Sequence, residues 1–303
     1  MRIGLSSYSI NGVIERGELT LEGAIDWAAR NGAEVFELVP FAFRFDDPDS
    51  GRIDTDKIRS ARKAARDAGI SLCNYSVSGD LLQEGEAQEK EVERLCREVD
   101  IASELGLTRM RHDIGGWGRK PEENTAAHFD ALLPRMAEAA ERVSAHAKTR
   151  GVKTLLENHG MFVNGSDRVE RVINTVNSEN YGLLLDTGNI ICVDEDPLAF
   201  VRRLAPRADM VHLKDFYVRA GNPGDAAPNY PQGTGFLSRG GIWLRGAILG
   251  QGDLDIPGTI RALKQAGYTG DVAIEFEGLE EARYASAVSI QNAKRWLKEA
   301  AEA

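Results

Sequence analysis

Residues 150–160 read RGVKTLLENHG and contain the structural unit that decides the fold. The segment before them, 122–149, has apolar residues spaced three and four apart, as on one face of a helix. Gly151 follows this segment, and glycine just beyond a helix commonly takes a left-handed conformation that a Cβ atom disfavours. A short, largely apolar run from Lys153 then predicts a strand. The unit is therefore a helix, a glycine stop and a strand.

The same unit recurs along the chain, with glycines at positions 32, 69, 106 and 267 before further apolar runs. Runs such as 182–185, GLLL, are continuously apolar, as in parallel strands that are buried on both faces. The predicted strands begin near Ile3, Val35, Ser71, Arg109, Lys153, Tyr181, Asp209 and Asp271.

Eight strands alternating with helices over 303 residues predict an α/β fold, a (β/α)8 TIM barrel that forms one domain, 1–303. The alternative is a doubly wound open sheet, which usually has a phosphate-binding glycine motif after its first strand. Residues 5–17, LSSYSINGVIERG, contain no such motif. The longest interruption is 216–256, which is rich in glycine and proline and lies between the seventh and eighth strands. We expect it to form a lid over the active site, because long loops in compact domains usually have such roles.

The composition restricts the class of protein. Hydrophobic residues make up 42% of the chain, and 37 basic against 47 acidic residues give a net charge of −10. This acidic balance argues against a nucleic-acid binder, which needs a basic surface. No apolar run approaches the ~18 residues of a membrane span, and the first residues enter a strand pattern rather than a signal peptide. Three scattered cysteines fit a reducing compartment. We therefore expect a cytoplasmic protein that binds no membrane. As a separate expectation, the protein forms a homo-oligomer, a dimer or a tetramer.

Polar side chains gather at the predicted carboxyl ends of the strands, where a barrel of this kind forms its active site. Three of the five histidines lie there. Because residues i and i+2 of a strand share one face, Glu157 points the same way as His159, and His212 the same way as Lys214. The residues at these strand ends are His112, Glu157, His159, Asp186, His212, Lys214, Glu275 and Glu277.

Three of the four carboxylates among them, Glu157, Asp186 and Glu275, need a cation if they are to stay charged inside a barrel. We expect one divalent metal ion, and the predicted ligands are Glu157, Asp186, His212 and Glu275. Three carboxylates and one imidazole favour Mn²⁺, with Mg²⁺, Co²⁺ or Zn²⁺ as other candidates. The alternative is that these carboxylates form structural ion pairs inside the barrel with Arg109, Arg111 or Lys214.

Four segments, in this order, resemble the xylose isomerase-like barrels of the sugar phosphate isomerase/epimerase superfamily. They are LLENHG (155–160), LLLDTGN (183–189), VHLKDF (211–216) and AIEFEG (273–278). That superfamily includes ketose 3-epimerases, hydroxypyruvate isomerases, inosose isomerases and dehydratases, and apurinic endonucleases of the endonuclease IV type. The resemblance implies the same four metal ligands. It also implies that Glu157 and Glu275 move protons on opposite faces of the substrate.

The chain departs from the superfamily pattern at two points. Asn189 occupies a position where the family often has a histidine three residues after the aspartate. The segments 71–78, SLCNYSVS, and 245–253, RGAILGQGD, lack the further histidines of the three-zinc endonuclease site. Together with the acidic charge, this argues against a role in DNA repair.

Two strand-end residues are candidates for catalysis beside the glutamates. His159 is either a general base or substrate hydrogen-bond donor, or a group that orients Glu157. Lys214 either stabilises an enolate oxygen as a fixed positive charge or forms a salt bridge with Asp215 or Glu157.

Further residues are predicted to bind the substrate: Glu37, His112, Trp117, Asn189 and Trp243. The alternative for His112 and Trp117 is a packed loop, and for Glu37 a simple charge at a strand end. The aromatic residues of the expected lid are Tyr217, Tyr230, Phe236 and Trp243, which are of the type that stacks on sugar rings. The alternative is that these rings pack against the barrel or a second subunit.

The first hypothesis for function is a metal-dependent isomerase or epimerase of a keto-sugar or related polyol, working by α-proton abstraction through a metal-bound enediolate. The second is a lyase or dehydratase on the same scaffold, acting by β-elimination on a 3-keto-sugar, a 3-keto-glycoside or an inosose. An oxidoreductase that makes 3-keto-sugars would then be its pathway partner. The third is a non-catalytic sugar-binding barrel, against which the full ligand set argues.

Overall fold

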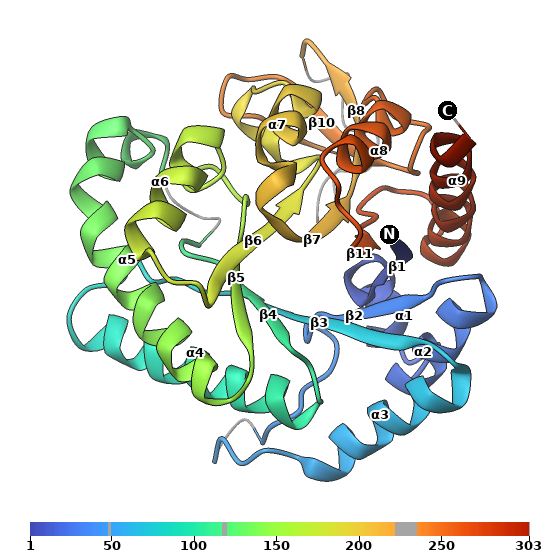
Figure 1. Cartoon of the computed structure of the whole chain (residues 1–303), viewed down its shortest axis with the longest axis horizontal. Coiled ribbons are helices and arrows are strands. Elements are labelled where there is room, and N and C mark those ends of the chain that lie inside the picture. Colours follow the sequence, from blue (N-terminus) through green and yellow to red (C-terminus); the bar gives the residue numbers. More distant parts are fainter. Residues whose placement is uncertain (48–49, 117–119, 222–234, 303) are drawn as a thin grey trace.

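The computed structural model describes residues 1–47, 50–116, 120–221 and 235–302. Eight parallel strands close into a barrel in the order β1, β2, β3, β4, β5, β6, β7 and β11, and β11 pairs with β1 (Figure 1). The strands are β1 (Arg2–Ser6), β2 (Val35–Leu38), β3 (Ser71–Val77), β4 (Arg109–His112), β5 (Lys153–Glu157), β6 (Tyr181–Asp186), β7 (Ala208–Leu213) and β11 (Asp271–Ile274). Each begins within one residue of its predicted start. The TIM barrel prediction is confirmed.

Helices surround the barrel, and α9 at the carboxyl end lies beside β1 (Figure 1). The longer helices are α2 (Leu21–Arg30), α3 (Thr55–Ala68), α4 (Glu86–Glu104), α5 (Ala126–Thr149), α6 (Ser166–Val176), α7 (Pro197–Leu204), α8 (Ile256–Gln265) and α9 (Ala282–Glu302). The short helices are α1 (Asn11–Glu15), η1 (Ser7–Ile10), η2 (Pro121–Glu123), η3 (Asn189–Val193) and η4 (Ala205–Arg207). The glycines of the repeated unit, at 32, 69, 106, 151 and 267, all have positive φ, as the helix-stop interpretation predicts.

The interior of the barrel is packed with side chains, so the functional site has a solid floor. One buried cluster consists of Val35, Cys73, Leu155, Leu184, Met210 and Ala273, one residue from each of six barrel strands. The larger core lies between the strands and the helices. Within the described ranges, no helix combines the length and apolar composition that a membrane crossing requires.

The segment 216–256 differs from the loop that we expected. Much of its described part belongs to a separate antiparallel sheet of three strands in the order β8, β10, β9. The strands are β8 (Asp215–Arg219), β9 (Phe236–Leu237) and β10 (Trp243–Ala247). Asp215 supports the turn after β10, because its carboxylate accepts hydrogen bonds from the backbone N–H groups of Gly250 and Gly252 at 2.7 and 3.0 Å.

Candidate metal centre

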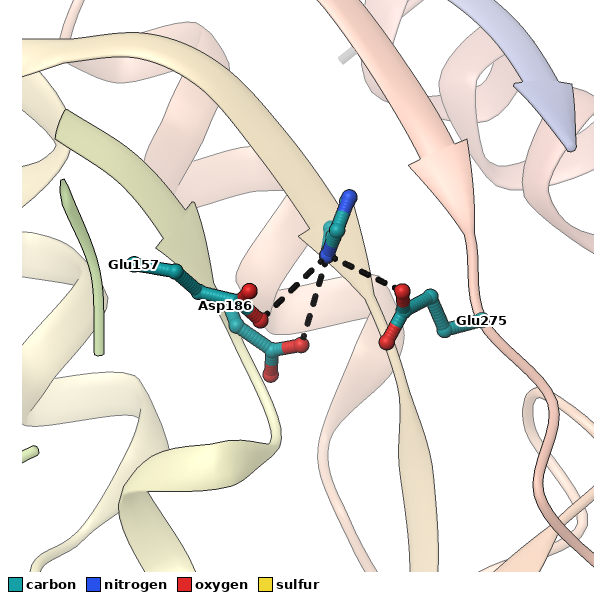
Figure 2. Close-up of side chains that lie close together, drawn as sticks. Glu157, Asp186 and Glu275 are labelled. Atoms are coloured by element: carbon teal, nitrogen blue, oxygen red, sulfur yellow. Dashed lines mark ion pairs between the residues drawn. The ribbon is translucent and has the colours of Figure 1, made fainter. Parts of the chain in front are cut away.

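Four polar side chains from neighbouring strands converge at the carboxyl end of the barrel. Glu157, Asp186 and His212 lie at or near the ends of β5, β6 and β7, and Glu275 directly follows β11. Asp186 and His212 are partners in the register of the β6–β7 pair. Figure 2 shows the carboxylates of Glu157, Asp186 and Glu275 pointing toward a common centre. One ligand atom from each of the four residues lies within 4.8 Å of the others.

The geometry of the cluster fits a divalent cation. His212 Nδ1 lies 3.5, 3.7 and 3.4 Å from carboxylate oxygens of Glu157, Asp186 and Glu275. In the described part of the chain, neither His212 Nδ1 nor Asp186 Oδ2 has a hydrogen-bond partner, although both atoms are buried. Buried polar atoms without partners are costly, and a cation among the four residues would satisfy both. Oxygen donors with one imidazole suit a hard or borderline ion.

Ion pairs also form within the barrel, as the alternative interpretation expected. Arg111 contacts Glu157, and Lys214 Nζ lies 2.9 Å from Glu275 Oε2. Burial by itself raises the pKa of Glu157, but Arg111 and His212 outweigh it and hold that pKa well below its usual range. Burial raises the pKa of Asp186 to about 6, although Lys214 opposes the shift. These ion pairs form at the edge of the cluster, and they leave Asp186 Oδ2 and His212 Nδ1 without hydrogen bonds to any described residue.

Arg109 and Lys214 differ in part from the expected pairings. Arg109 contacts Asp271 at the opposite end of the barrel and therefore does not reach the cluster. Lys214 pairs with Glu275, rather than with the expected Asp215 or Glu157, and its Nζ also lies 3.5 Å from Glu277 Oε2.

Glu37 lies behind the cluster, and this corrects the prediction that it binds the substrate. Its carboxylate is fully buried and lies 2.9 Å from His212 Nε2, on the side of the ring away from the cluster. Asn74 and Ser76 donate hydrogen bonds to Glu37 Oε1 at 2.8 and 2.7 Å. Burial opposes the charge on Glu37, but His212 outweighs it and lowers the pKa of this carboxyl. Glu37 therefore orients the imidazole so that Nδ1 faces the cluster.

Replacing Glu37 by Gln is expected to weaken metal binding by about 10–100-fold, because the imidazole loses the carboxylate that orients it. Competition against a chromogenic chelator measures this affinity. Glu86→Gln, on an exposed side chain of α4, is the matched control and should bind the metal like the wild type. An unchanged affinity in Glu37→Gln would show that the imidazole is oriented without this carboxylate.

Asn189 links the cluster to Lys214, which lies beside it. Its Nδ2 donates to Glu157 Oε1 at 3.0 Å, and its Oδ1 accepts from Lys214 Nζ at 3.1 Å. The backbone leading to Asn189 must pass close to β7, because a Cβ atom on Gly188 would lie 2.9 Å from Lys214 Cβ. Only glycine fits there without displacement, which explains the glycine at position 188.

His159 faces the cavity and is held by a residue that sequence reasoning did not single out. Its Nδ1 lies 2.9 Å from Asp113 Oδ1, and Arg111 donates to the same oxygen at 2.7 Å. Burial lowers the pKa of His159, but the Asp113 carboxylate outweighs burial and raises it overall. The signal in the sequence that could have indicated this role of Asp113 is its position directly after β4.

A cavity of about 430 Å³ opens above the cluster, within the ~300–1,000 Å³ range of small-molecule sites. Its polar lining includes Arg111, Asp113, Glu157, His159, Lys214 and Glu275. Asn189 also lines it, as does Phe236 from the small sheet.

Two other predicted substrate-binding residues are placed away from this cavity. His112 is fully buried in the barrel wall, and its Nδ1 lies 3.0 Å from the Asp113 carbonyl oxygen. Trp243 is buried in β10, where a Cβ atom on Gly235 would lie 2.4 Å from its ring, so it packs within the small sheet. Both predictions are corrected: these side chains are packed rather than presented to a substrate. Trp117 and Tyr230 lie outside the described residues.

Comparison with known proteins identifies the family. A family model described as xylose isomerase-like TIM barrel matches residues 25–300. An inosose dehydratase from Lacticaseibacillus casei is 25% identical over 180 residues, which cover 58% of each chain, so the match spans less than two thirds of that relative. A solved L-ribulose 3-epimerase has a TM-score of 0.74 at 21% identity, covering 99% of this chain and 96% of that one. A Mycobacterium smegmatis barrel in complex with magnesium has a TM-score of 0.67 at 16% identity, covering 99% and 97%.

The two structural comparisons support the fold, and the family model covers nearly all of the chain, including the strands that carry the cluster. The protein belongs to the xylose isomerase-like TIM barrel family.

Proposed function

We propose that this protein is an isomerase or epimerase that binds one divalent metal ion, Mn²⁺ first among the candidates, and removes a proton next to the carbonyl of a keto-sugar or related polyol. One observation carries the proposal: the carboxylates of Glu157 and Glu275 approach His212 Nδ1 from two different strands, at 3.5 and 3.4 Å, and both line the cavity. Two carboxylates on different sides of a bound substrate suit removal and return of a proton.

The four clustered residues would hold the ion, which supplies Lewis-acid polarisation of a substrate carbonyl when bound. Glu275 removes the proton from the carbon beside the carbonyl, since its side chain is the more exposed of the two glutamates, at 10% against 3%. Lys214 stabilises the negative charge that develops on the carbonyl oxygen, because its Nζ is a fixed cation that faces the cavity. In this scheme Glu157 must take up a proton from solvent before it returns one on the opposite face or at the neighbouring carbon, and Glu275 then releases the abstracted proton to solvent.

A second candidate is a dehydratase, which the pairing of His159 with Asp113 favours. In a β-elimination the base takes the α-proton, the C–O bond at the next carbon breaks, and the leaving oxygen needs a proton to depart as water. His159 faces the cavity and is hydrogen-bonded to a carboxylate, so it suits the role of that proton donor. The partial similarity to an inosose dehydratase supports this candidate.

Product analysis separates the two candidates. The Mn²⁺-loaded protein is incubated with inosose, D-allulose, D-tagatose and L-ribulose, and the products are followed by ¹³C NMR and mass spectrometry. An isomerase or epimerase gives a product of unchanged mass, whereas a dehydratase gives a product lighter by one water. His159→Gln should abolish only the second outcome. If none of the four compounds is converted, the result contradicts both candidate functions for these substrates.

A further inference from the structure

The cavity above the cluster has two walls of different chemistry. The wall after β4 and β5 is polar and contains Arg111, Asp113 and His159. These groups are already linked to one another by hydrogen bonds, through Asp113 Oδ1. This wall presents several hydrogen-bonding atoms to a ligand.

A second wall follows β1, β2 and β11, and apart from Glu275 and Glu277 its lining is apolar or aromatic. The apolar or aromatic residues are Tyr8, Val39, Phe41 and Leu279. In the closed eight-stranded order, β1 lies four strands from β5, and β11 lies four strands from β4. The residues after β1 and β11 therefore lie across the barrel mouth from the polar wall, whereas β2, which precedes Val39 and Phe41, is two strands from β4 and three from β5. The four-residue cluster lies on the floor of the cavity.

Phe41 is the most informative residue of the apolar wall. It lines the cavity and is 55% exposed, and its ring lies 6.1 Å from the Tyr8 ring in an edge-to-face arrangement. The Tyr8 hydroxyl donates a hydrogen bond to Glu277 Oε2 at 3.2 Å, so the ring of Tyr8 remains as its apolar surface. The wall thus offers two aromatic rings and two aliphatic side chains in one surface. Phe41 is the exposed member of this group, whereas Val39 is buried, and a large apolar side chain exposed beside a polar cavity is available to contact a ligand.

A bare sugar matches only half of this cavity. Its hydroxyl groups are distributed around the ring, and those facing Val39, Phe41 and Leu279 would lose water without gaining protein partners, which is costly. An apolar ring would instead be buried against Phe41 and Tyr8 with favourable aromatic contacts. The opposite wall would still bind the hydroxyl-bearing part.

We infer that the substrate is amphipathic: a sugar or cyclic polyol that carries an apolar ring substituent, as an aryl glycoside does. The inference rests on the proposed function in one respect: the proposed function places the sugar part over the four-residue cluster. The substituent lies between Phe41 and Leu279, and the polyol faces Arg111 and His159. The apolar wall therefore selects among substrates by the group attached to the sugar.

Isothermal titration calorimetry tests this inference with two glycosides that differ only in the attached group. The Mn²⁺-loaded protein is titrated with phenyl β-D-glucopyranoside and with methyl β-D-glucopyranoside. We expect the phenyl compound to bind about tenfold more tightly or better, because it buries an additional ring. Phe41→Ala should bring the ratio of the two dissociation constants close to one. Tyr284→Ala, which removes an aromatic side chain that is 60% exposed on α9, should keep the wild-type ratio.

Three results would overturn the inference: equal affinities for the two glycosides, no binding of the phenyl glycoside, or a ratio that Phe41→Ala leaves unchanged. The titration requires no turnover, so it is independent of the proposed reaction. A phenyl preference in a protein that catalyses no proton exchange supports the amphipathic ligand and contradicts the proposed function. Proton exchange without a phenyl preference supports the proposed function and contradicts the amphipathic ligand.

Discussion

Glu157→Gln is expected to lose its metal ion, whereas the wild-type protein retains close to one divalent ion per chain after expression with added Mn²⁺ and dialysis. The substitution removes one of three carboxylates from a buried centre whose atoms lie within 4.8 Å of one another. Groups that merely orient a ligand are worth about 10–100-fold in metal affinity, so loss of a ligand should cost at least about 100-fold. Elemental analysis of the dialysed proteins measures the content directly.

Glu277→Gln is the matched control for this experiment. Glu277 also lines the cavity and lies near Lys214, but it is outside the four-residue cluster, so its variant should keep the metal. A Glu157→Gln protein that stays fully loaded would show that the ion is held elsewhere. A wild-type protein that is active after exhaustive chelation would remove the metal from the account altogether.

The second large effect is expected in Glu275→Gln, which should slow proton abstraction by about 10²–10⁴-fold when metal is supplied at saturation. A glutamine amide at this position cannot accept the proton, although it occupies the same volume. The rate of turnover is measured together with the bound metal, so that loss of the base is separated from loss of the ion. Glu280→Gln serves as the control, because Glu280 pairs loosely with Arg245, at 3.8 Å, beside the cavity. A metal-saturated Glu275→Gln protein with the wild-type rate would assign the base to another residue.

The fold could be predicted because it is encoded in local patterns. Glycine stops and continuously apolar runs place all eight barrel strands within one residue of their starts. The strand ends then bring the four candidate ligands to one end of the barrel by topology alone. Leu155 and Met210, two residues before Glu157 and His212, fill the interior as the two-residue period of a strand requires.

The misplaced residues depend on geometry that a local pattern does not contain. A register shift in the β2–β3 pairing lies between Phe36 and Glu37, where Cys73 of β3 is left without a partner in β2. The extra residue is in β3, so Glu37 still points into the barrel like Val35, two residues before it. The local pattern does not contain its partner, His212 from β7. Trp243 pairs with Arg219 across the small antiparallel sheet, and its partner lies too far away in sequence for composition to reveal the pairing.

The apolar wall was also beyond local reasoning. Tyr8, Phe41 and Leu279 come from three segments that meet only when the barrel closes. Nothing in the local sequence around these residues indicates a binding role, and none of them belongs to the four segments that resemble the superfamily motifs. The inference about the group attached to the sugar therefore depends on the assembled cavity and could not be made from the sequence.

Solvent deuterium incorporation tests the central claim, metal-dependent proton abstraction beside a carbonyl, most directly. The Mn²⁺-loaded protein is incubated in D₂O with whichever of inosose, D-allulose, D-tagatose and L-ribulose it converts, and the hydrogen next to the carbonyl is followed by ¹H NMR. The account predicts that this hydrogen is replaced by deuterium at a rate that chelation abolishes and re-added Mn²⁺ restores. Product that forms without deuterium from the solvent, as in a direct hydride shift, or exchange that continues undiminished in the metal-free protein, would contradict it.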